Sequence, residues 1–491
     1  MVIKSIDTRT VVAKFALNGK NVHPEAVKLI INSGVDVDRI VDFACRKCNG
    51  SFIITPEDIS DVLKELASRR EEKKVFDTGL KDTPKGEVES RGQVSILKDV
   101  TGKSTCRGTV EDFVAYFNSR YEKLYSILKP RVKAIPIGSL GRIKMEEVEV
   151  IGFADNVREL DSSKAMFELE DKTGRVRVYA EGKVKEQVME LFGDEVIGVA
   201  GRLRGRSIIA DRIIFPDVPI SNGNRKSRDF LMVFISDVHF GSNTFLSEEW
   251  SRFVKWLNGE SENEKLNELA HSVKYIFVAG DLTDGVGIYP DQEKELEILD
   301  IYQQYEFAAE QFDLIRKDIK IILSPGNHDA VRQAEPQPAL PKEFASLFPK
   351  NVIHVGNPAY VDVEGIKVLL YHGRSLDDII SRVPRLSYER PHEAVMELLK
   401  RRHLAPLYGE RSPIAPEKED YLVIDDIPDV IHSGHVHTYG TGFYRGVFVI
   451  NSSTWQSQTE FQKKVNLNPV PGNVAVYQPG GNVYRLKFYS G

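Results

Sequence analysis

The apolar run Ile319-Lys-Ile-Ile-Leu323 is followed within a few residues by the polar tip Gly326-Asn-His-Asp329. The same succession of a short apolar run and a polar tip recurs on both sides of it, in residues 231–235, 275–278, 368–371, 430–431 and 447–450. Helical patterns separate these runs, as expected of strands that are buried between layers of helices. Residues 228–491 are therefore predicted to form one α/β domain.

The tips of these predicted strands carry side chains that bind metals. They are carboxylates, imidazoles and an amide: Asp237, His239, Asp281, Asn327, His372, His435 and His437. Because the functional groups of open α/β sheets gather outside the carboxyl ends of the strands, we expect these side chains to lie at one rim. Carboxylate, imidazole and amide ligands suit Mn²⁺, Fe or Zn²⁺. The pattern therefore predicts a metal site.

Two cations at this rim would suit the hydrolysis of a phosphate ester. Two metal ions about 3.5–4 Å apart can bind both the attacking and the leaving oxygen of the ester. One carboxylate must then bridge the ions, and Asp281 is the natural choice because it stands alone on its tip. The opposing interpretation, a structural histidine at a strand end, explains a single tip but not several in succession. The histidines outside the tips are interpreted as structural: His23, His271, His354, His392, His403 and His432.

The segment before this domain has the pattern of a small barrel. Residues 110–128 place apolar side chains three or four apart, which predicts an amphipathic helix that docks on the next domain. Short alternating runs follow at 148–151, 165–169, 176–179, 196–200 and 207–210, with a helical stretch at 183–191 between the third and the fourth. Five strands with a helix in that place are the arrangement of an OB-fold. Residues 109–220 are therefore predicted to be a docking helix and an OB-fold barrel.

The N-terminal part is predicted to be a small helical module, residues 1–70, followed by a flexible linker, residues 71–108. Pro24 and Pro56 are placed as first-turn residues of helices, and the linker is polar with few apolar residues. Cys45 and Cys48 form half of a zinc site, and Cys106 is too distant in sequence to complete it. Two partly buried thiols are the favoured interpretation.

Composition limits the classes of protein to which the chain can belong. With 491 residues, of which 41% are hydrophobic and 28% charged, it is expected to be a multidomain globular protein. Because it has no apolar run of membrane-spanning length, no secretion signal and only 3 cysteines, we expect a cytoplasmic protein with no membrane partner. The net charge of −6 excludes binding of nucleic acid by bulk charge alone. The candidate local patch contains Arg374, Arg382 and Arg385.

The polar motifs at the strand tips, in this order along the chain, resemble those of the calcineurin-like metallophosphoesterase superfamily. This superfamily includes the nuclease of double-strand-break repair. The resemblance implies that one metal is held by Asp237, His239, Asp281 and His437, and the other by Asp281, Asn327, His372 and His435. It also implies that His328 donates a proton to the leaving oxygen or stabilises its charge, and that Asp329 orients this imidazole. One position differs from the motifs of this superfamily: Asp284 occupies the place where the repair nuclease has a second histidine. This carboxylate is expected to bind a further cation or to affect the choice of substrate.

A phosphoesterase domain behind an OB-fold and a helical module resembles the small subunits of replicative DNA polymerases. Eukaryotic members of that group lack the metal ligands, whereas this chain keeps them. The resemblance therefore points to the small subunits of the archaeal family D DNA polymerases. Two further segments look like stretches of that family: Gly280-Asp-Leu-Thr-Asp-Gly-Val-Gly-Ile-Tyr-Pro290 and Ser453-Thr-Trp-Gln-Ser-Gln-Thr-Glu-Phe-Gln462.

The function that this resemblance implies is a metal-dependent 3′→5′ exonuclease that proofreads during DNA replication, in complex with a large catalytic polymerase subunit. Two divalent ions would be its cofactors, with Mn²⁺ preferred over Mg²⁺, Fe and Zn²⁺, and single-stranded or mispaired 3′ ends of DNA its substrate. Arg374, Arg382 and Arg385 would follow the phosphates of the strand. An apolar surface around Trp455 and Phe461 would dock the large subunit. Two alternatives stay open: a scaffold with a vestigial site, and a stand-alone phosphodiesterase or phosphatase.

Overall fold

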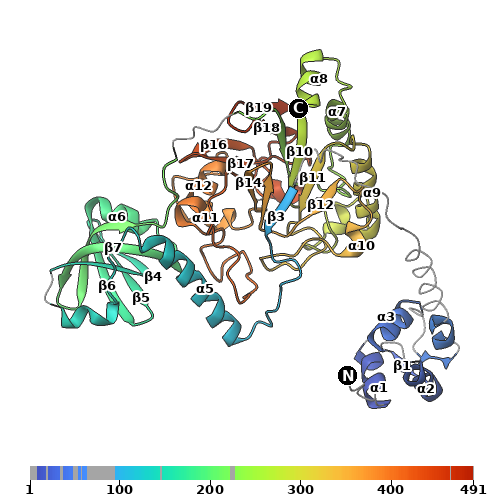
Figure 1. The fold of residues 1–491 in the computed structure, drawn as a ribbon, viewed down its shortest axis with the longest axis horizontal. Coiled ribbons are helices and arrows are strands. Elements are labelled where there is room, and N and C mark those ends of the chain that lie inside the picture. The colour runs from blue at the N-terminus through green and yellow to red at the C-terminus, as the bar shows by residue number, and fades with distance from the viewer. Residues whose placement is uncertain are drawn as a thin grey trace, which may run out of the picture. The chain divides into compact units, whose positions relative to one another are not determined.

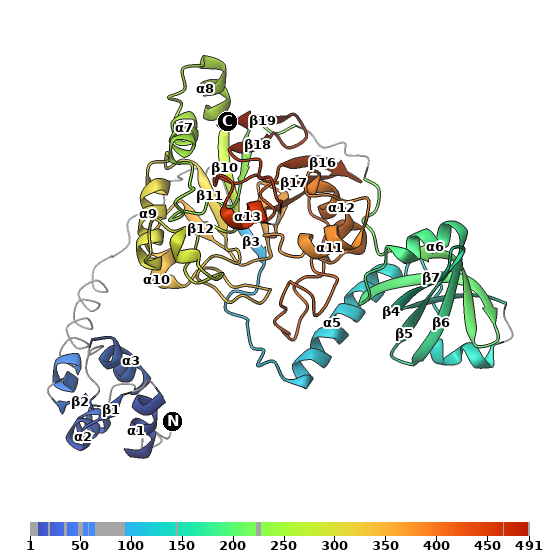
Figure 2. The same cartoon turned by 180° about the vertical axis from the view of Figure 1, so that it is seen from behind.

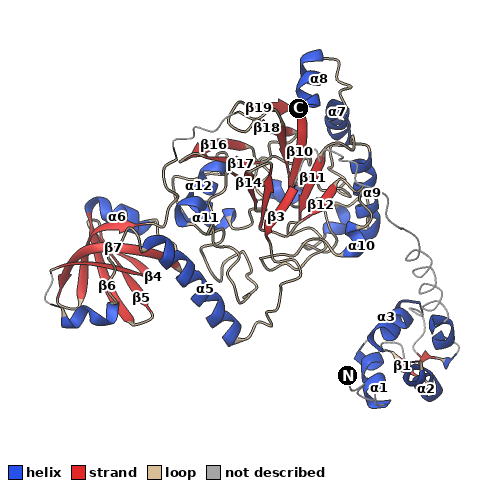
Figure 3. Ribbon diagram, in the orientation of Figure 1, coloured by secondary structure: helices blue, strands red, loops and turns tan. Residues whose placement is uncertain are grey.

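The computed structural model describes residues 8–17, 20–33, 37–47, 53–56, 58–63, 94–143, 146–221, 227–464 and 466–489. The chain divides into two compact units, Met1–Glu89 and Ser90–Gly491. Figures 1 and 2 show the ribbon from opposite sides, and Figure 3 distinguishes its helices from its strands. None of the helices in the described part of the chain combines the length and the apolar content that crossing a bilayer requires.

The N-terminal unit is built from short helices and a small parallel sheet. Its elements are α1 (Thr8–Leu17), α2 (Pro24–Asn32), α3 (Val37–Lys47), β1 (Asn21–Val22) and β2 (Ile53–Ile54). Pro24 begins α2, as predicted, and Phe15 and Ile40 are fully buried in the core between the helices. The half zinc site stays a prediction, because Cys48 and the side chain of Cys45 lie outside the described residues.

The larger unit contains a closed barrel with the strand order β4-β5-β6-β8-β7. Its elements are η1 (Ile137–Arg142), β4 (Glu147–Asp161), β5 (Lys164–Asp171), β6 (Gly174–Glu181), α6 (Gly182–Met189), β7 (Glu195–Arg204) and β8 (Ser207–Ile214). The antiparallel pairing of β4 with β7 closes the barrel, and β6 pairs parallel with β8. Phe167, Val178 and Ile208 are fully buried in its interior. The predicted strands, and the helix between the third and the fourth, are confirmed.

The residues beyond the barrel, together with one strand that precedes it, form an α/β domain around two six-stranded sheets. The first sheet has the order β12-β11-β10-β9-β18-β19 and the second β16-β17-β15-β14-β13-β3. The strands of the first are β9 (Leu231–Ile235), β10 (Val273–Ala279), β11 (Lys320–Ser324), β12 (Val352–His354), β18 (Asn473–Tyr477) and β19 (Val483–Lys487). Those of the second are β3 (Val94–Lys98), β13 (Ala359–Val363), β14 (Ile366–Leu370), β15 (Val430–Ser433), β16 (Gly440–Tyr444) and β17 (Val447–Asn451).

Helices cover the outer faces of both sheets, and an apolar core fills the space between them. The helices are α7 (Ser247–Leu257), α8 (Glu264–His271), α9 (Ile301–Asp313), α10 (Lys342–Ala345), α11 (Leu376–Arg382), α12 (Pro391–Arg401) and α13 (Glu460–Lys464), with the short η2 (Gln292–Lys294). Helices α7, α9 and α10 lie on the side of the first sheet, and α11 and α12 on that of the second (Figures 1 and 2). Phe234, Phe277 and Val368 are buried between the two sheets.

Strand β3 corrects one sequence-based boundary. It lies inside the range predicted as linker, yet it pairs antiparallel with β13 at the edge of the second sheet. Lys98 at its end binds Asp425 at 2.6 Å. A strand of five residues within a polar stretch carries too little periodicity to be recognised, and its backbone is satisfied only by the distant partner strand.

Helix α5 (Val110–Leu128) joins the barrel to the α/β domain through a buried ion pair. Arg120 and Asp420 are both 0% exposed, and the arginine Nε donates to the carboxylate at 2.9 Å. The hydroxyl of Tyr116 contacts the same arginine at 2.9 Å, and Nε2 of His403 lies 2.9 Å from Asp420. A buried charge is tolerated only when it is paired in this way. The predicted docking helix therefore fixes the barrel against the α/β domain.

Candidate metal centre

Both sheets send their strand tips to the same rim of the α/β domain. Strands β9, β10 and β11 run parallel in the first sheet, and β14 and β15 run parallel in the second. The predicted ligands follow the carboxyl ends of these strands: Asp237 and His239 after β9, Asp281 after β10, Asn327 after β11, His372 after β14, and His435 and His437 after β15. Parallel strands end at one edge of a sheet, which explains how segments distant in sequence meet.

The backbone at these tips is strained. Five of the predicted ligands have left-handed φ angles: Asp237 at 50°, His239 at 55°, Asp281 at 50°, His435 at 72° and His437 at 55°. Residues other than glycine rarely adopt this conformation, and such strain gathers at functional sites because the surrounding structure imposes it. Glycines allow the tips to approach closely: a Cβ atom on Gly326 would lie 2.2 Å from the Asp281 carboxylate, and one on Gly434 2.3 Å from that of Asp237.

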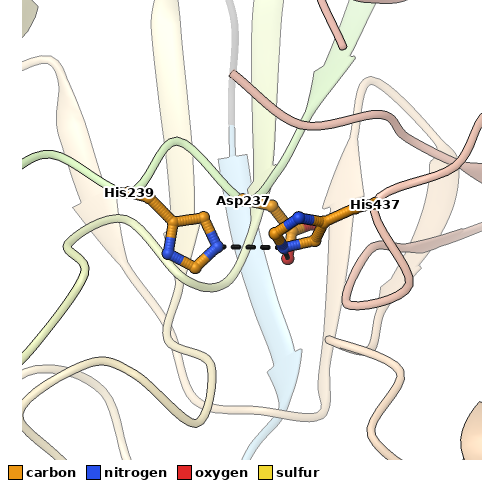
Figure 4. Close-up of side chains that lie close together, drawn as sticks. All are labelled: Asp237, His239 and His437. Carbon is orange, nitrogen blue, oxygen red and sulfur yellow. Dashed lines mark hydrogen bonds and ion pairs between the residues drawn. The ribbon is translucent and has the colours of Figure 1, made fainter. Parts of the chain in front are cut away.

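Asp237, His239 and His437 form what we call the first cluster (Figure 4). The Nε2 atoms of the two histidines lie 3.0 Å apart, and Nε2 of His437 lies 3.4 Å from Oδ1 of Asp237. Two nitrogens that each lie ~2.0–2.1 Å from one tetrahedral Zn²⁺ would be roughly 3.3 Å apart. Oδ2 of Asp237 accepts a hydrogen bond from the Ser236 hydroxyl, and the backbone N–H of His435 donates to Oδ2 at 2.9 Å and to Oδ1 at 3.1 Å. Oδ1 of Asp237 is the oxygen that faces His437.

The second cluster contains Asp281, Asn327, His372 and His435. Nε2 of His372 lies 3.2 Å from Oδ2 of Asp281 and 3.0 Å from Oδ1 of Asn327. Nδ1 of His435 lies 3.3 Å from the same His372 nitrogen. The other ring nitrogen of His372 contacts the backbone oxygen of Ala279 at 2.8 Å, which directs Nε2 into the cluster. The structure thus brings together all the predicted ligands, in two adjacent groups.

The charge of this rim fits cations. Asp237, Asp281 and Asp284 are at most 1% exposed, and in the described part of the chain they form ion pairs only with histidines. Buried carboxylates are costly unless they are paired or bind a metal. Burial raises the pKa of Asp281, but His372 and His328 outweigh burial and hold this pKa well below its ordinary value. Ionised carboxylates and imidazoles are therefore the donor set present, and it suits two divalent ions.

A metal ion bound at His372 would displace a proton from its imidazole ring. Burial lowers the pKa of His372, but the Asp281 carboxylate outweighs burial and raises it to about 10. The ring is therefore protonated at neutral pH when no cation is bound. A metal ligand must be the neutral imidazole, so binding of a cation releases this proton.

His328 lies at the rim, but Asp329 does not orient it, and that prediction was wrong. Nδ1 of His328 contacts the backbone oxygen of Asp284 at 2.7 Å. The Asp329 carboxylate instead accepts hydrogen bonds from the backbone N–H groups of Leu282 and Gly326, at 3.2 and 2.9 Å. A carboxylate surrounded by loop amides is satisfied locally and holds the two loops together. His328 is oriented by a backbone carbonyl.

Asp284, which departs from the resemblance, is buried beside His239. Its Oδ1 lies 2.9 Å from Nδ1 of His239 and accepts a hydrogen bond from Gln456 at 3.1 Å, and its Oδ2 accepts one from Gln292 at 3.1 Å. His239, Asp284 and His328 form a further group of ligand-type atoms. Because Nε2 of His239 faces the first cluster, its Nδ1 would carry the proton in a metal complex. This favours a role beside His239 over a separate cation site.

The predicted DNA-binding arginines differ in their surroundings. Arg382 pairs with Glu410 at 2.7 Å, and Arg385 pairs with Glu190 and Glu397. Arg374 has no carboxylate partner among its described contacts. It donates to the side chain and backbone oxygens of Gln333, whose amide donates to the backbone oxygen of Asn327 at 2.6 Å. Among the three arginines, Arg374 is thus linked to a predicted metal ligand through Gln333.

A pocket of about 180 Å³ opens above the clusters. Its walls include Asp281, His328 and His437 together with residues outside the tips: Asp284, Tyr289, Asp377, Gln456, Thr459, Gln462 and Leu467. Motif reasoning missed Asp377, Gln456 and Gln462, although the last two lie in a segment already singled out for its resemblance to one family. The available signal was the pair of acidic residues that follows the His372 tip at the start of a helix.

Trp455 does not contribute to the docking surface predicted around it and Phe461. Trp455 is 2% exposed and packs against Trp250, Phe253 and Phe488 at ring-centroid distances of 5.1, 4.9 and 6.0 Å. The side chain of Phe461 lies outside the described residues. The alternative interpretation, a packed loop after the last tip, is therefore the right one for Trp455.

The known proteins that this chain resembles in sequence are small subunits of DNA polymerases. The model of the family formed by the B subunits of DNA polymerases alpha and epsilon matches residues 232–441. The DNA polymerase II small subunit of Archaeoglobus fulgidus is 57% identical, with 100% of both chains covered. That of Methanothermobacter thermautotrophicus is 48% identical over 78% of this chain and 81% of the relative, and that of Methanocaldococcus jannaschii 43% over 77% and 65%. An asparaginyl-tRNA synthetase structure from Pyrococcus horikoshii, 14% identical over 15% of this chain and 20% of its own, reaches a TM-score of only 0.14.

Proposed function

Because the chain belongs to the family of archaeal DNA polymerase II small subunits, the small subunits of the family D polymerases, we propose that it is the metal-dependent 3′→5′ exonuclease of such a polymerase. The convergence of the two clusters on one pocket is the observation that carries this proposal. The proposed cofactors are two divalent ions, Mn²⁺ first, and the proposed partner is the large catalytic subunit. The α/β domain is proposed to be a calcineurin-like phosphoesterase.

The residues at the rim have complementary parts in hydrolysis. When bound, two divalent ions would polarise the phosphate and activate water for attack. His328 lines the pocket, and its Nδ1 contacts a backbone oxygen, so its Nε2 is directed toward the Asp281 side of the site. It is placed to give a proton to the leaving oxygen. Arg374, beside the Asn327 loop, is placed to bind a phosphate of the strand being shortened.

The barrel supports the same assignment. Counted along the barrel, its strands have the order 1-2-3-5-4, and α6 lies between the third and the fourth. This order supports the proposal that the barrel is an OB-fold, a fold that binds oligonucleotides in many proteins. Helix α5 and the Arg120–Asp420 pair fix this barrel against the α/β domain, so both would contact one strand or one partner as a unit.

A nuclease assay on the full chain tests the proposal. The substrate is a duplex with a mispaired 3′ end, labelled internally, with Mn²⁺ or with a chelator. Degradation is expected from the 3′ end, faster than from a paired end, and absent in chelator. A phosphorothioate linkage at the 3′ end should block degradation, whereas the same linkage at the 5′ end should not.

The same preparation is then tested on bis(p-nitrophenyl) phosphate and with added large subunit. Hydrolysis of this small diester without any action on DNA would support a stand-alone phosphodiesterase instead. No hydrolysis of either substrate, with and without the large subunit, would support a scaffold. Degradation from the 5′ end would remove the proofreading role.

A further inference from the structure

The far side of His435 meets an acidic residue that no motif includes. Asp377 lies in the first turn of α11, and its Oδ2 interacts with Nε2 of His435 at 3.2 Å. Its other oxygen accepts a hydrogen bond from the hydroxyl of Tyr388 at 2.9 Å. The side chain of Asp377 is 27% exposed, so water competes for it, and the Tyr388 hydroxyl restrains it. The carboxylate is thereby fixed between a phenol and an imidazole.

His435 is turned the opposite way from the other histidines of the rim. His372 and His437 direct their Nε2 atoms toward the carboxylates of Asp281 and Asp237, at 3.2 and 3.4 Å. His435 instead directs Nδ1 into the second cluster, 3.3 Å from Nε2 of His372. A neutral imidazole carries one proton, so a ring that binds a cation through Nδ1 must hold this proton on Nε2. An acceptor at Nε2 selects that tautomer.

We propose that Asp377 is a positioning residue of the second cluster. It holds His435 as the Nε2–H tautomer and directs Nδ1 at the cation, while Tyr388 holds Asp377. The inference rests on the proposed metal centre and names a part of it that the ligand motifs leave out. Asp377 is not a ligand itself, because it contacts the ring nitrogen on the side away from the cluster.

Tyr388 supports Asp377 from behind the metal site. Its hydroxyl is engaged by Asp377, and its ring packs against the core under α11 and α12. Its backbone oxygen accepts a hydrogen bond from the Thr438 hydroxyl at 2.6 Å, next to the tip that carries His435 and His437. The chain of contacts runs from this tip through Tyr388 and Asp377 back to the imidazole of His435.

The wild-type chain tests the tautomer without any substitution. The full-length protein is labelled with ¹⁵N at histidine, loaded with Zn²⁺ and examined by NMR, with His435→Gln used to identify the His435 signals. We expect Nδ1 of His435 to have the shift of a metal-bound nitrogen and Nε2 to carry a proton. Coordination of His435 through Nε2, with the proton on Nδ1, would overturn the inference.

Zn²⁺ affinity, measured by competition with a chelator, tests the role of Asp377. Loss of the hydrogen-bond partner behind a metal-bound histidine typically lowers metal affinity by about 10–100-fold. Asp377→Asn should therefore lower the affinity for one of the two Zn²⁺ ions by roughly 10–100-fold. Tyr388→Phe, which removes only the hydroxyl, should lower the affinity for the same ion by a smaller factor. Asp378→Asn is the matched control, because it removes an equal charge at the adjacent position. The Asp378 carboxylate accepts hydrogen bonds from the backbone N–H of Arg411 and the hydroxyl of Ser412. Both ions should bind to this variant as they do to the wild type.

The outcomes separate this inference from the proposed function. If the wild type binds two Zn²⁺ ions and Asp377→Asn binds both as tightly, the positioning role is wrong while the metal centre stands. If Asp377→Asn retains one ion and the wild-type spectrum lacks a proton on Nε2 of His435, Asp377 is a ligand and the inference is overturned. If the wild type binds no Zn²⁺, the metal centre and the inference both fail.

Discussion

The Nε2 atom of His328 lies 4.0 Å from Oδ2 of Asp281, while the backbone N–H of His328 donates a 2.8 Å hydrogen bond to Oδ1 of the same carboxylate. One oxygen of Asp281 is thus satisfied by the protein and the other is turned toward the clusters. Asp281 would therefore help to hold the divalent ions with a carboxylate whose orientation the His328 N–H fixes. The same contact holds the loop that carries His328 close to the reacting region, so the imidazole can act without binding a metal.

His328→Ala should separate metal binding from chemistry. Both metals should remain, because the side chain lies outside both clusters and the backbone N–H that holds Asp281 is kept. Hydrolysis should fall by roughly a hundred-fold or more, as expected from loss of a proton donor or charge stabiliser. Metal content is measured beside the rate on a labelled strand. Loss of metal in parallel with activity would show that His328 is a ligand.

Asp281→Asn should remove the shared carboxylate and leave the fold intact. A neutral amide cannot share charge between two cations, so metal content should fall well below two equivalents and hydrolysis should stop. Circular dichroism should be unchanged, because the hydrogen bond from the His328 N–H can be accepted by the amide oxygen. An active Asp281→Asn protein with two full equivalents of metal would rule out the bridging role.

The metal ligands were predictable because each follows a short apolar run in the sequence, and such a run determines where in the fold the next residues lie. A short apolar run forms a buried strand, and a glycine-flanked polar tip after it must emerge at the carboxyl edge of the sheet. This is why Asp237, Asp281 and His372 were found in sequence although they come from different strands. The barrel was predictable for a similar reason, since its alternating runs are long enough to show a period of two.

What could not be predicted depends on contacts between distant segments. Asp377 reaches His435 only because α11 packs beside the tip of β15, and no spacing in sequence encodes that contact. Asp329 was assigned to the wrong partner because the donors to its carboxylate are backbone N–H groups of two loops, and the sequence does not show that these loops meet. Trp455 was expected at the surface, whereas two of the aromatic side chains that bury it, Trp250 and Phe253, lie far away in sequence on α7.

Trp455→Ala should destabilise the α/β domain rather than weaken a docking surface. The side chain is 2% exposed, and truncation of a buried aromatic to alanine typically costs about 3–5 kcal/mol. Its backbone N–H also donates to the backbone oxygen of Asp237 at 3.0 Å, so metal binding should weaken with the fold. Phe443→Ala, at a side chain 57% exposed, is the control and should cost far less. Equal melting temperatures for wild type and Trp455→Ala would contradict the packing.

His354→Phe should make the α/β domain less sensitive to acid. His354 lies in β12 against Phe348 at 5.1 Å, both of its ring nitrogens are covered, and burial lowers its pKa to about 4. The unfolded chain takes up this proton near its ordinary pKa of about 6.5, so the folded state loses stability as pH falls from that value toward 4. At pH 4.5 the loss attributable to His354 should be roughly 2–3 kcal/mol, and a phenylalanine of similar shape removes it. Urea unfolding of both proteins at pH 7.5 and 4.5, in chelator so that metal release does not contribute, measures the difference. An equal loss of stability in wild type and His354→Phe between the two pH values would show that this imidazole is not held neutral by the fold.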